Sequence, residues 1–180
     1  MSAFCIPLED QTPLFRDSYQ HPHFEQRTHI NLNLEQDINP YWIELFKPHD
    51  LEVYRVELFY GPDQFPYTMG IHTDRNYGDW AKINWIFGGD GSQMHWYKPL
   101  TSHNKEVKST DVHSNYNLYE PSEVRLLRSE SVSTPSIVQV GIPHNITNPG
   151  QERWCYSMVI HDKTTQNHVS FGRLRRAFGK

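Results

Sequence analysis

Polar and apolar residues alternate along several short segments of the chain. Ile30, Leu32 and Leu34 alternate with asparagines, which is the period of a half-buried strand, so residues 28–34 are predicted to form one. The same alternation recurs later between turn signals rich in glycine, proline and asparagine. The later predicted strands are residues 51–60, 67–73, 81–88, 93–98, 116–119, 123–131, 136–142 and 152–161. Eight short strands in this arrangement predict an all-β sandwich or barrel.

A short helix is predicted ahead of these eight strands. Asn39 supplies an N-cap, and Pro40 occupies the first helical position. The residues that follow give the helix one apolar side, and Pro48 ends it. We expect the helix to pack on the outside of the sheet, in a fold that is mainly β.

The length of 180 residues is most simply one domain, residues 1–180. Its predicted parts are an N-terminal arm with the first strand and the helix (1–50), the β core (51–161) and a basic C-terminal tail (162–180). The last ten residues hold four positive charges and no acid. They are predicted to be a solvated end, folded as a short helix whose Leu174 and Phe178 pack back.

The composition limits the partners of the protein. A net charge of −4 gives no general electrostatic case for nucleic acid or an anionic membrane, so a small-molecule or peptide partner is expected. The oligomeric state stays open. The two cysteines do not have the spacing of a disulfide framework or a zinc site. The first twenty residues do not read as a signal peptide and no window is long enough to span a bilayer, so a cytoplasmic protein is expected.

A candidate metal site is formed by His72 and Asp74, with His144 as the third ligand. Side chains two apart on a strand point the same way, so the imidazole and the carboxylate can grip one ion. Two histidines and one carboxylate are the facial arrangement of non-haem Fe(II) sites. Because the chain has eleven histidines, the pair could also arise by composition and be ordinary surface chemistry. His21-Pro-His23 is a second possible ligand pair, for which an exposed turn is the better interpretation.

The order and spacing of four residues resemble a known family. His144 follows His72 by 72 positions, and Arg153 follows His144 by nine. In this respect residues 51–161 resemble the Fe(II)- and 2-oxoglutarate-dependent dioxygenases, and among them the small phage- or marine-type members. Further shared motifs are Ala81-Lys-Ile-Asn84, His95-Trp-Tyr97, and Pro143-His144 with Asn148. The resemblance implies a double-stranded β-helix, also called a jelly roll or cupin-like fold.

The resemblance also assigns roles to the site residues. It implies Fe(II) on His72, Asp74 and His144, with Arg153 holding the far carboxylate of 2-oxoglutarate. An arginine presents a planar fork that suits a carboxylate. Many family members have Arg-x-Ser, whereas this chain has Arg153-Trp-Cys-Tyr-Ser157. Ser157 shares a strand face with Arg153, so it could donate to the same carboxylate. An ion pair of Arg153 with Glu152 or Asp162 is the alternative.

Three further residues could line the pocket for cosubstrate or substrate: Asn84, Trp96 and Tyr97. Asn84 lies between two apolar residues and stands on the opposite face of its strand. A buried asparagine must be paired, which suits a site. For Trp80, Trp85 and Trp96 a core position is the better interpretation.

The resemblance implies an oxygenase that uses dioxygen and 2-oxoglutarate, releases succinate and CO2, and hydroxylates a small molecule, amino acid or peptide side chain. Two other functions stay open. One is a cupin-like metalloenzyme that does not use 2-oxoglutarate. The other is a non-catalytic jelly-roll module that binds a carbohydrate or a protein.

Overall fold

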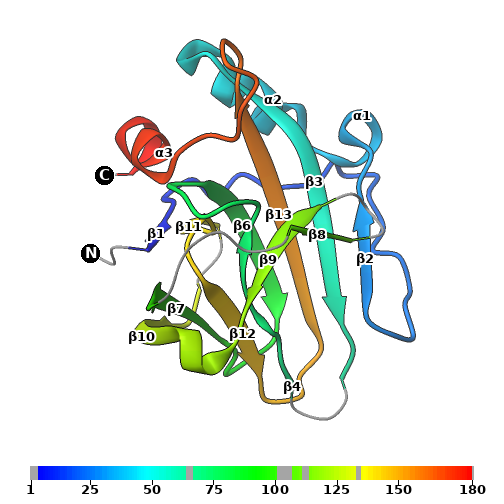
Figure 1. Cartoon of the computed structure of the whole chain (residues 1–180). Helices are drawn as coiled ribbons and strands as arrows, with labels where there is room; N and C mark the ends of the chain where they lie inside the picture. The colour runs from blue at the N-terminus through cyan, green and yellow to red at the C-terminus, as the bar shows by residue number, and fades with distance from the viewer. Residues whose placement is uncertain (1–3, 64–66, 101–106, 111–113, 133–134, 180) are drawn as a thin grey trace.

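The computed structural model describes residues 4–63, 67–100, 107–110, 114–132 and 135–179 (Figure 1). Strands are β1 Cys5–Pro7, β2 Thr28–Asn31, β3 Leu51–Gly61, β4 Tyr67–Thr68, β5 Ile71–Asp74, β6 Ala81–Gly88, β7 Gln93–Pro99, β8 Lys108–Ser109, β9 Asn115–Tyr119, β10 Val124–Glu130, β11 Ser136–Gln139, β12 His144–Asn148 and β13 Arg153–Asp162. Helices are α1 Leu34–Asp37, α2 Pro40–Phe46 and α3 Phe171–Phe178, with 3-10 turns at Lys47–His49 and Pro121–Glu123. None of the helices in these ranges has the length and apolar character needed to cross a membrane.

The strands form two antiparallel sheets. In the main sheet the order is β1-β11-β6-β13-β3-β2, and in the second sheet it is β10-β7-β12-β5-β9-β8, with β4 paired to β12. The chain passes from β3 in the main sheet to β5 in the second, returns to β6 and crosses again to β7. It then follows β10 in the second sheet, β11 in the main sheet, β12 in the second and β13 in the main. This alternation is that of a double-stranded β-helix, so the prediction of a mainly β jelly roll is confirmed.

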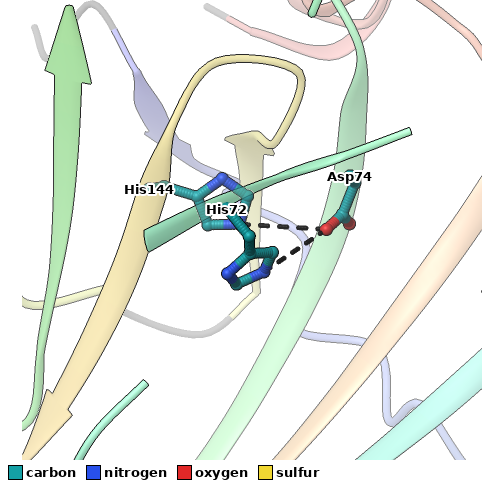
Figure 2. Close-up of side chains that lie close together, drawn as sticks. All are labelled: His72, Asp74 and His144. Carbon is teal, nitrogen blue, oxygen red and sulfur yellow. Dashed lines mark ion pairs between the residues drawn. The ribbon is translucent and has the colours of Figure 1, made fainter. Parts of the chain in front are cut away.

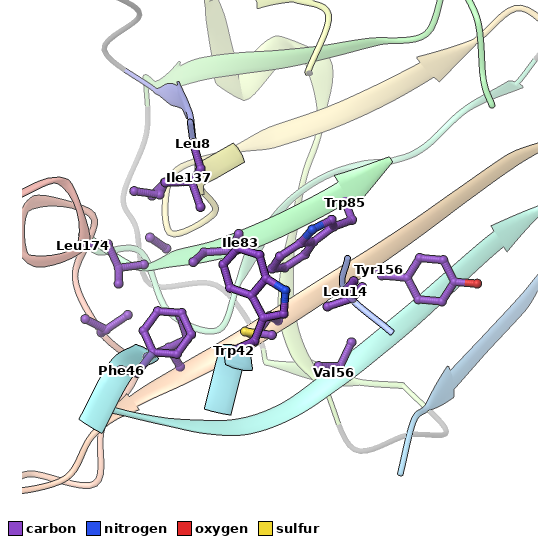
Figure 3. Close-up of a cluster of buried hydrophobic side chains, with 14 of the residues drawn as sticks. Leu8, Leu14, Trp42, Phe46, Val56, Ile83, Trp85, Ile137, Tyr156 and Leu174 are labelled. Atoms are coloured by element: carbon purple, nitrogen blue, oxygen red, sulfur yellow. The ribbon is translucent and has the colours of Figure 1, made fainter. Parts of the chain in front are cut away.

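The largest hydrophobic core lies on the outer face of the main sheet (Figure 3). Every second residue of β3, β6 and β13 contributes to it, and the N-terminal arm, α2 and α3 cover it. The intervening residues of the same strands face the second sheet. Several of these are polar and buried: Glu57, Lys82, Asn84, Arg153 and Ser157. The outer core therefore stabilises the main sheet and leaves its inner face for polar groups.

The N-terminal elements follow the sequence prediction with one difference. Asn39 caps α2, its side chain accepting a hydrogen bond from the Tyr41 backbone, and Pro40 opens the helix. Trp42 is buried and meets Trp85 edge to face, with ring centroids 4.9 Å apart. The predicted strand 28–34 stops at residue 31, because Asn33 caps α1 through its side chain.

His21 belongs to an aromatic cluster rather than to a ligand set. Its Nδ1 lies 2.6 Å from the hydroxyl of Tyr156, and its ring contacts those of Phe15 and Trp154. Within the described residues, His21 and His23 take part in no group of three metal-ligating side chains. Residues 21–23 have no regular secondary structure, and the aromatic packing of His21 replaces the exposed turn that was predicted.

The predicted strand 116–119 is confirmed as β9, which pairs with β5 and β8, but one strand of the jelly roll was not predicted. The missing core strand is β12, which starts at His144, a residue predicted to lie beyond a strand's end. Its polar residues resemble a turn, yet Asn145 donates to the Met69 carbonyl oxygen and Asn148 binds the following turn. Paired polar side chains are compatible with a buried strand.

Helix α3 packs against the outer core through Leu174 and Phe171, both buried. The Phe178 ring meets Phe46 edge to face at 5.2 Å, and Arg173 forms an ion pair with Asp162. Thus the basic segment is a packed helix with exposed arginines, as the position of Leu174 predicted. Lys180 lies outside the described residues. The longest polar stretch of the sequence, residues 99–115, was predicted to be a loop near the site or a lid, with an ordinary surface excursion as the alternative, and its residues 101–106 and 111–113 also lie outside the described residues.

His161 in β13 and His168, which forms an isolated β-bridge with it, are expected to make the stability depend on pH. His161 and His168 have ring centroids 4.8 Å apart, and His161 Nε2 and His168 Nδ1 have no hydrogen-bond partner. Burial and the nearby Arg75 lower the pKa of both, that of His168 to about 3. Below about pH 6.5 the unfolded chain binds protons that the folded chain excludes, so stability falls as the pH drops towards 3.

Denaturation at pH 7.5 and pH 5 measures this effect. A completely excluded proton would cost about 2 kcal/mol at pH 5, and partial exposure of His168 reduces that figure. The His168→Gln variant should lose less stability than wild type between the two pH values. The control, in which Gln replaces the exposed His23, should lose as much stability as wild type. Equal losses in wild type and His168→Gln would show that His168 is protonated in the folded state.

Candidate metal centre

Two neighbouring strands bring the three predicted ligands together. His72 and Asp74 lie on β5 of the second sheet with one residue between them, so both side chains point the same way, towards the main sheet, where Lys82 contacts Asp74. His144 opens β12 and pairs directly with His72. Ligand atoms from the three side chains lie within 4.8 Å of one another (Figure 2).

Each histidine is oriented by a backbone carbonyl group. His72 Nδ1 lies 2.9 Å from the Gly70 carbonyl oxygen, and His144 Nδ1 lies 2.9 Å from that of Ile142. When Nδ1–H donates to a carbonyl oxygen, Nε2 carries the lone pair that can bind a metal. Both Nε2 atoms face Asp74 Oδ1, at 3.6 Å from His72 and 3.9 Å from His144. These distances are too long for hydrogen bonds, and they place three potential metal-ligating atoms around one point.

The protonation states suit metal binding. Burial and the neighbouring His72 lower the pKa of His144 to about 3, so its imidazole is neutral near pH 7. Burial alone would raise the pKa of the Asp74 carboxyl, but Lys82 and the two histidines hold it below its usual value. The cluster therefore offers one carboxylate and a neutral imidazole without a change of protonation.

Lys82 is part of the site, although the sequence did not single it out. Its ammonium group lies 2.7 Å from Asp74 Oδ2 and 2.7 Å from Glu57 Oε2. Burial would lower the pKa of Lys82, but the two carboxylates raise it above its usual value. The alternation of side chains along β6 places Lys82 and Asn84 on the inner face, opposite the buried Ala81 and Ile83. This pattern was the signal in the sequence that could have identified Lys82.

Glu57 completes the charge network behind the ligands. Its side chain is fully buried, and Arg55 contacts it at 2.8 Å while the Ser114 hydroxyl donates to it. The network therefore contains two carboxylates, Asp74 and Glu57, and two cations, Lys82 and Arg55. Removing any one of them would leave a buried charge uncompensated, which is strongly destabilising.

A cavity of about 270 Å³ joins the ligand cluster to Arg153. Arg153 opens β13, is only 6% exposed, and its Nε has no hydrogen-bond partner. The two acids considered as its partners are engaged elsewhere: Glu152 accepts from the Tyr60 hydroxyl and Asp162 pairs with Arg173. Among the described residues, Arg153 has no carboxylate partner.

The turn after β6 holds the stem of Arg153 in place. Gly89 has a φ of +69°, and a Cβ there would come within 2.7 Å of Arg153 Cγ. Glycine at position 89 thus permits both the left-handed turn and the close approach of the arginine.

The free Cys155 thiol also lines the cavity. Burial raises the pKa of this thiol, and Arg153 opposes that shift.

Ser157 and Asn84 both line the cavity and bind each other. The Ser157 hydroxyl donates to Asn84 Oδ1 at 2.7 Å, as expected for residues that are direct cross-strand partners. A serine has one proton to donate. In this structure Ser157 donates that proton to Asn84, and not to a group beside Arg153.

The structure does not bring Tyr97 to the cavity. Because Trp96 pairs with His144 and faces inward, its neighbour Tyr97 faces the other side of β7. Its hydroxyl donates to Asn145 Oδ1 at 3.0 Å, and its ring packs on the small cluster of Ile71, Tyr119 and Val124. Trp96 is fully buried, in agreement with its expected core position.

A second cavity, of about 220 Å³, adjoins the ligand cluster. His72 and Asp74 line both cavities, whereas Arg153 lines only the first. Tyr116 and Leu118 of β9 line only the second. The two cavities therefore meet at the candidate ligands and differ in their walls, because the first contains Arg153 and the second contains apolar side chains of β9.

No protein-family model matches the chain, and no curated protein is significantly similar to it. Similar solved structures include peruvianin-I, a cysteine peptidase from Thevetia peruviana latex, with 11% identity over 94% of both chains and a TM-score of 0.36. Oxalate oxidase in complex with the substrate analogue glycolate, and recombinant oxalate oxidase with glycolate, each have 11% identity over 94% of this chain and 78% of theirs, with TM-scores of 0.35. Likenesses of this strength carry no argument about activity, which has to come from the site.

Proposed function

We propose that this protein is an Fe(II)- and 2-oxoglutarate-dependent oxygenase that hydroxylates a small molecule, an amino acid or a peptide side chain. One observation carries the proposal: a cluster of two histidines and one aspartate shares a cavity with a buried arginine that has no carboxylate partner among the described residues. The cluster of two histidines and one aspartate suits a metal ion, and the arginine suits a dicarboxylate that reaches this metal.

The residues present fit this pair of ligands. Two imidazole nitrogens and one carboxylate oxygen form the donor set of the facial triad, which leaves coordination positions open for other ligands. The buried guanidinium of Arg153 needs an acceptor, and a carboxylate is its strongest partner. A cavity of about 270 Å³ lies just below the range of about 300–1,000 Å³ that suits drug-sized ligands, so it fits a small cosubstrate.

The chain's own residues have separate tasks in the proposed reaction. Bound Fe(II), with 2-oxoglutarate and dioxygen, supplies the oxidising chemistry. His72 and His144 would hold the ion through Nε2 and Asp74 through Oδ1, while Arg153 orients the far carboxylate. Apolar side chains of the first cavity, Phe59, Met69, Met94 and Val140, exclude water from the reacting groups.

The second cavity is the proposed entry for the substrate. The cation within its wall, Lys82, is already paired with Asp74 and Glu57, so it offers no free charge to a ligand. Tyr116 and Leu118 instead offer apolar surface. We therefore expect the group that reacts to be uncharged and carbon-rich.

An anaerobic titration tests the proposal. Metal-free protein is titrated with Fe(II) and then with 2-oxoglutarate, and a weak visible charge-transfer band should appear only after the second addition. Succinate, which lacks the 2-oxo group needed for chelation, is the matched control and should give no band. Iron binding without a band would favour a metalloenzyme that does not use 2-oxoglutarate. No iron binding would favour a non-catalytic binding module.

A further inference from the structure

The two oxygens of the Asp74 carboxylate have different neighbours. Oδ1 faces the two histidine nitrogens, at 3.6 Å from His72 and 3.9 Å from His144. Oδ2 lies 2.7 Å from the ammonium group of Lys82. One oxygen is therefore directed at the candidate metal position, and the other is already bound.

Lys82 cannot easily move away from this contact. Its side chain is 5% exposed, and its ammonium group is also held at 2.7 Å by Glu57 Oε2. Glu57 is itself fixed by Arg55 and Ser114. Movement of the ammonium group away from the buried Glu57 and the half-buried Asp74 would leave buried charges unpaired, which is costly.

We propose that Lys82 is a positioning residue that restricts Asp74 to binding the metal through one oxygen. This inference rests on the proposed function, because it concerns the same metal site. With Asp74 bound through Oδ1 alone, the three side chains would supply one ligand atom each and would leave coordination positions for 2-oxoglutarate and dioxygen. A second oxygen from Asp74 would take one of those positions.

The alternative role for Lys82 is charge balance alone. In that case any change that keeps the cluster neutral should leave the metal site unaltered. Replacing Lys82 by Met together with Glu57 by Gln removes one cation and one anion, so the remaining Asp74 and Arg55 still balance. The double variant therefore separates the positioning role from the electrostatic one, and it protects the fold if Lys82→Met alone is unstable.

The test uses protein loaded with Co(II), whose visible d–d spectrum reports coordination number. We expect K82M/E57Q to bind Co(II) with a spectrum different from that of wild type, and to bind 2-oxoglutarate at least about tenfold more weakly, the scale of losses from residues that orient metal ligands. Lys82→Arg, which retains a donor, should restore part of both properties. Lys98→Met, at an exposed position on β7, is the control and should resemble wild type.

Two results would overturn the inference. An unchanged spectrum with unchanged 2-oxoglutarate affinity would leave Lys82 with charge balance alone. Loss of Co(II) from a folded double variant would mean that Lys82 holds Asp74 in place for metal binding but does not limit Asp74 to one oxygen. The proposed function is tested separately by the wild type: if it binds Co(II) but not 2-oxoglutarate, that proposal fails while the spectra still decide the role of Lys82.

Discussion

Replacing His144 by alanine is expected to abolish metal binding while the second sheet stays formed. The imidazole supplies one of only three candidate ligand atoms, so its loss should weaken metal affinity by more than about 100-fold, beyond the 10- to 100-fold cost of losing an outer-shell partner. The backbone of residue 144 pairs with β5 and β7, and alanine can make the same hydrogen bonds. The change in unfolding free energy should stay within about 2 kcal/mol.

Metal content after Fe(II) loading and oxygen-dependent release of succinate measure this effect. His95→Ala is the matched control, since His95 lies on the adjoining strand but binds the Ser129 and Thr147 hydroxyls instead of the cluster. The control should load metal as wild type does. If His144→Ala also loads metal normally, the cluster is not the metal site.

The sequence predicted the candidate ligands because their geometry is largely local. His72 and Asp74 share a strand face by the period of two, and that relation does not depend on how the sheets pair. His144 was chosen because it follows an apolar stretch predicted to be a strand, and the strand that it opens, β12, was missed. The polar run that begins at Asn145 resembles a loop until Met69 and Tyr97 are seen to supply hydrogen-bond partners.

Lys82 and Glu57 could not be predicted in the same way. They are 25 positions apart and lie on strands separated by β13, whose Val159 and Ser157 pair with Lys82 and Glu57 respectively. Their contact depends on the register of three strands, which a single sequence does not specify. The alternation of Val56, Leu58 and Tyr60 in β3 was visible, but it could not say that this face is the outer core and that the other face lies inside the jelly roll.

The polar interior has a consequence for stability. The outer core can be large because it is covered by the arm and two helices, whereas the space between the sheets holds charges that must be paired. Of the buried charged groups, Lys82 and Glu57 pair with each other, and Lys82 also pairs with the half-buried Asp74. Arg153 is the exception, and an uncompensated buried cation is expected where binding of a ligand supplies the missing charge.

Replacing Arg153 by leucine is therefore expected to affect the cosubstrate far more than the metal. A charge-assisted hydrogen bond contributes about 1.5–3 kcal/mol, so 2-oxoglutarate binding should weaken by about 10- to 150-fold. Iron affinity should change by less than about threefold, because Arg153 is not one of the ligand atoms. Arg153→Lys should give an intermediate loss, since lysine retains the charge but not the planar fork.

The stability of the metal-free variant gives a second, independent result. If Arg153 supported the fold, its replacement would destabilise the protein. If its guanidinium instead serves to bind a ligand, it lowers the stability of the ligand-free protein. Arg153→Leu is thus expected to unfold at the same denaturant concentration as wild type or a higher one in the absence of 2-oxoglutarate. Both proteins should gain stability when metal is added, and wild type should gain more than the variant when 2-oxoglutarate follows. Parallel losses of stability, iron affinity and cosubstrate affinity would instead mean that Arg153 supports the fold, and the case for 2-oxoglutarate would lose its main observation.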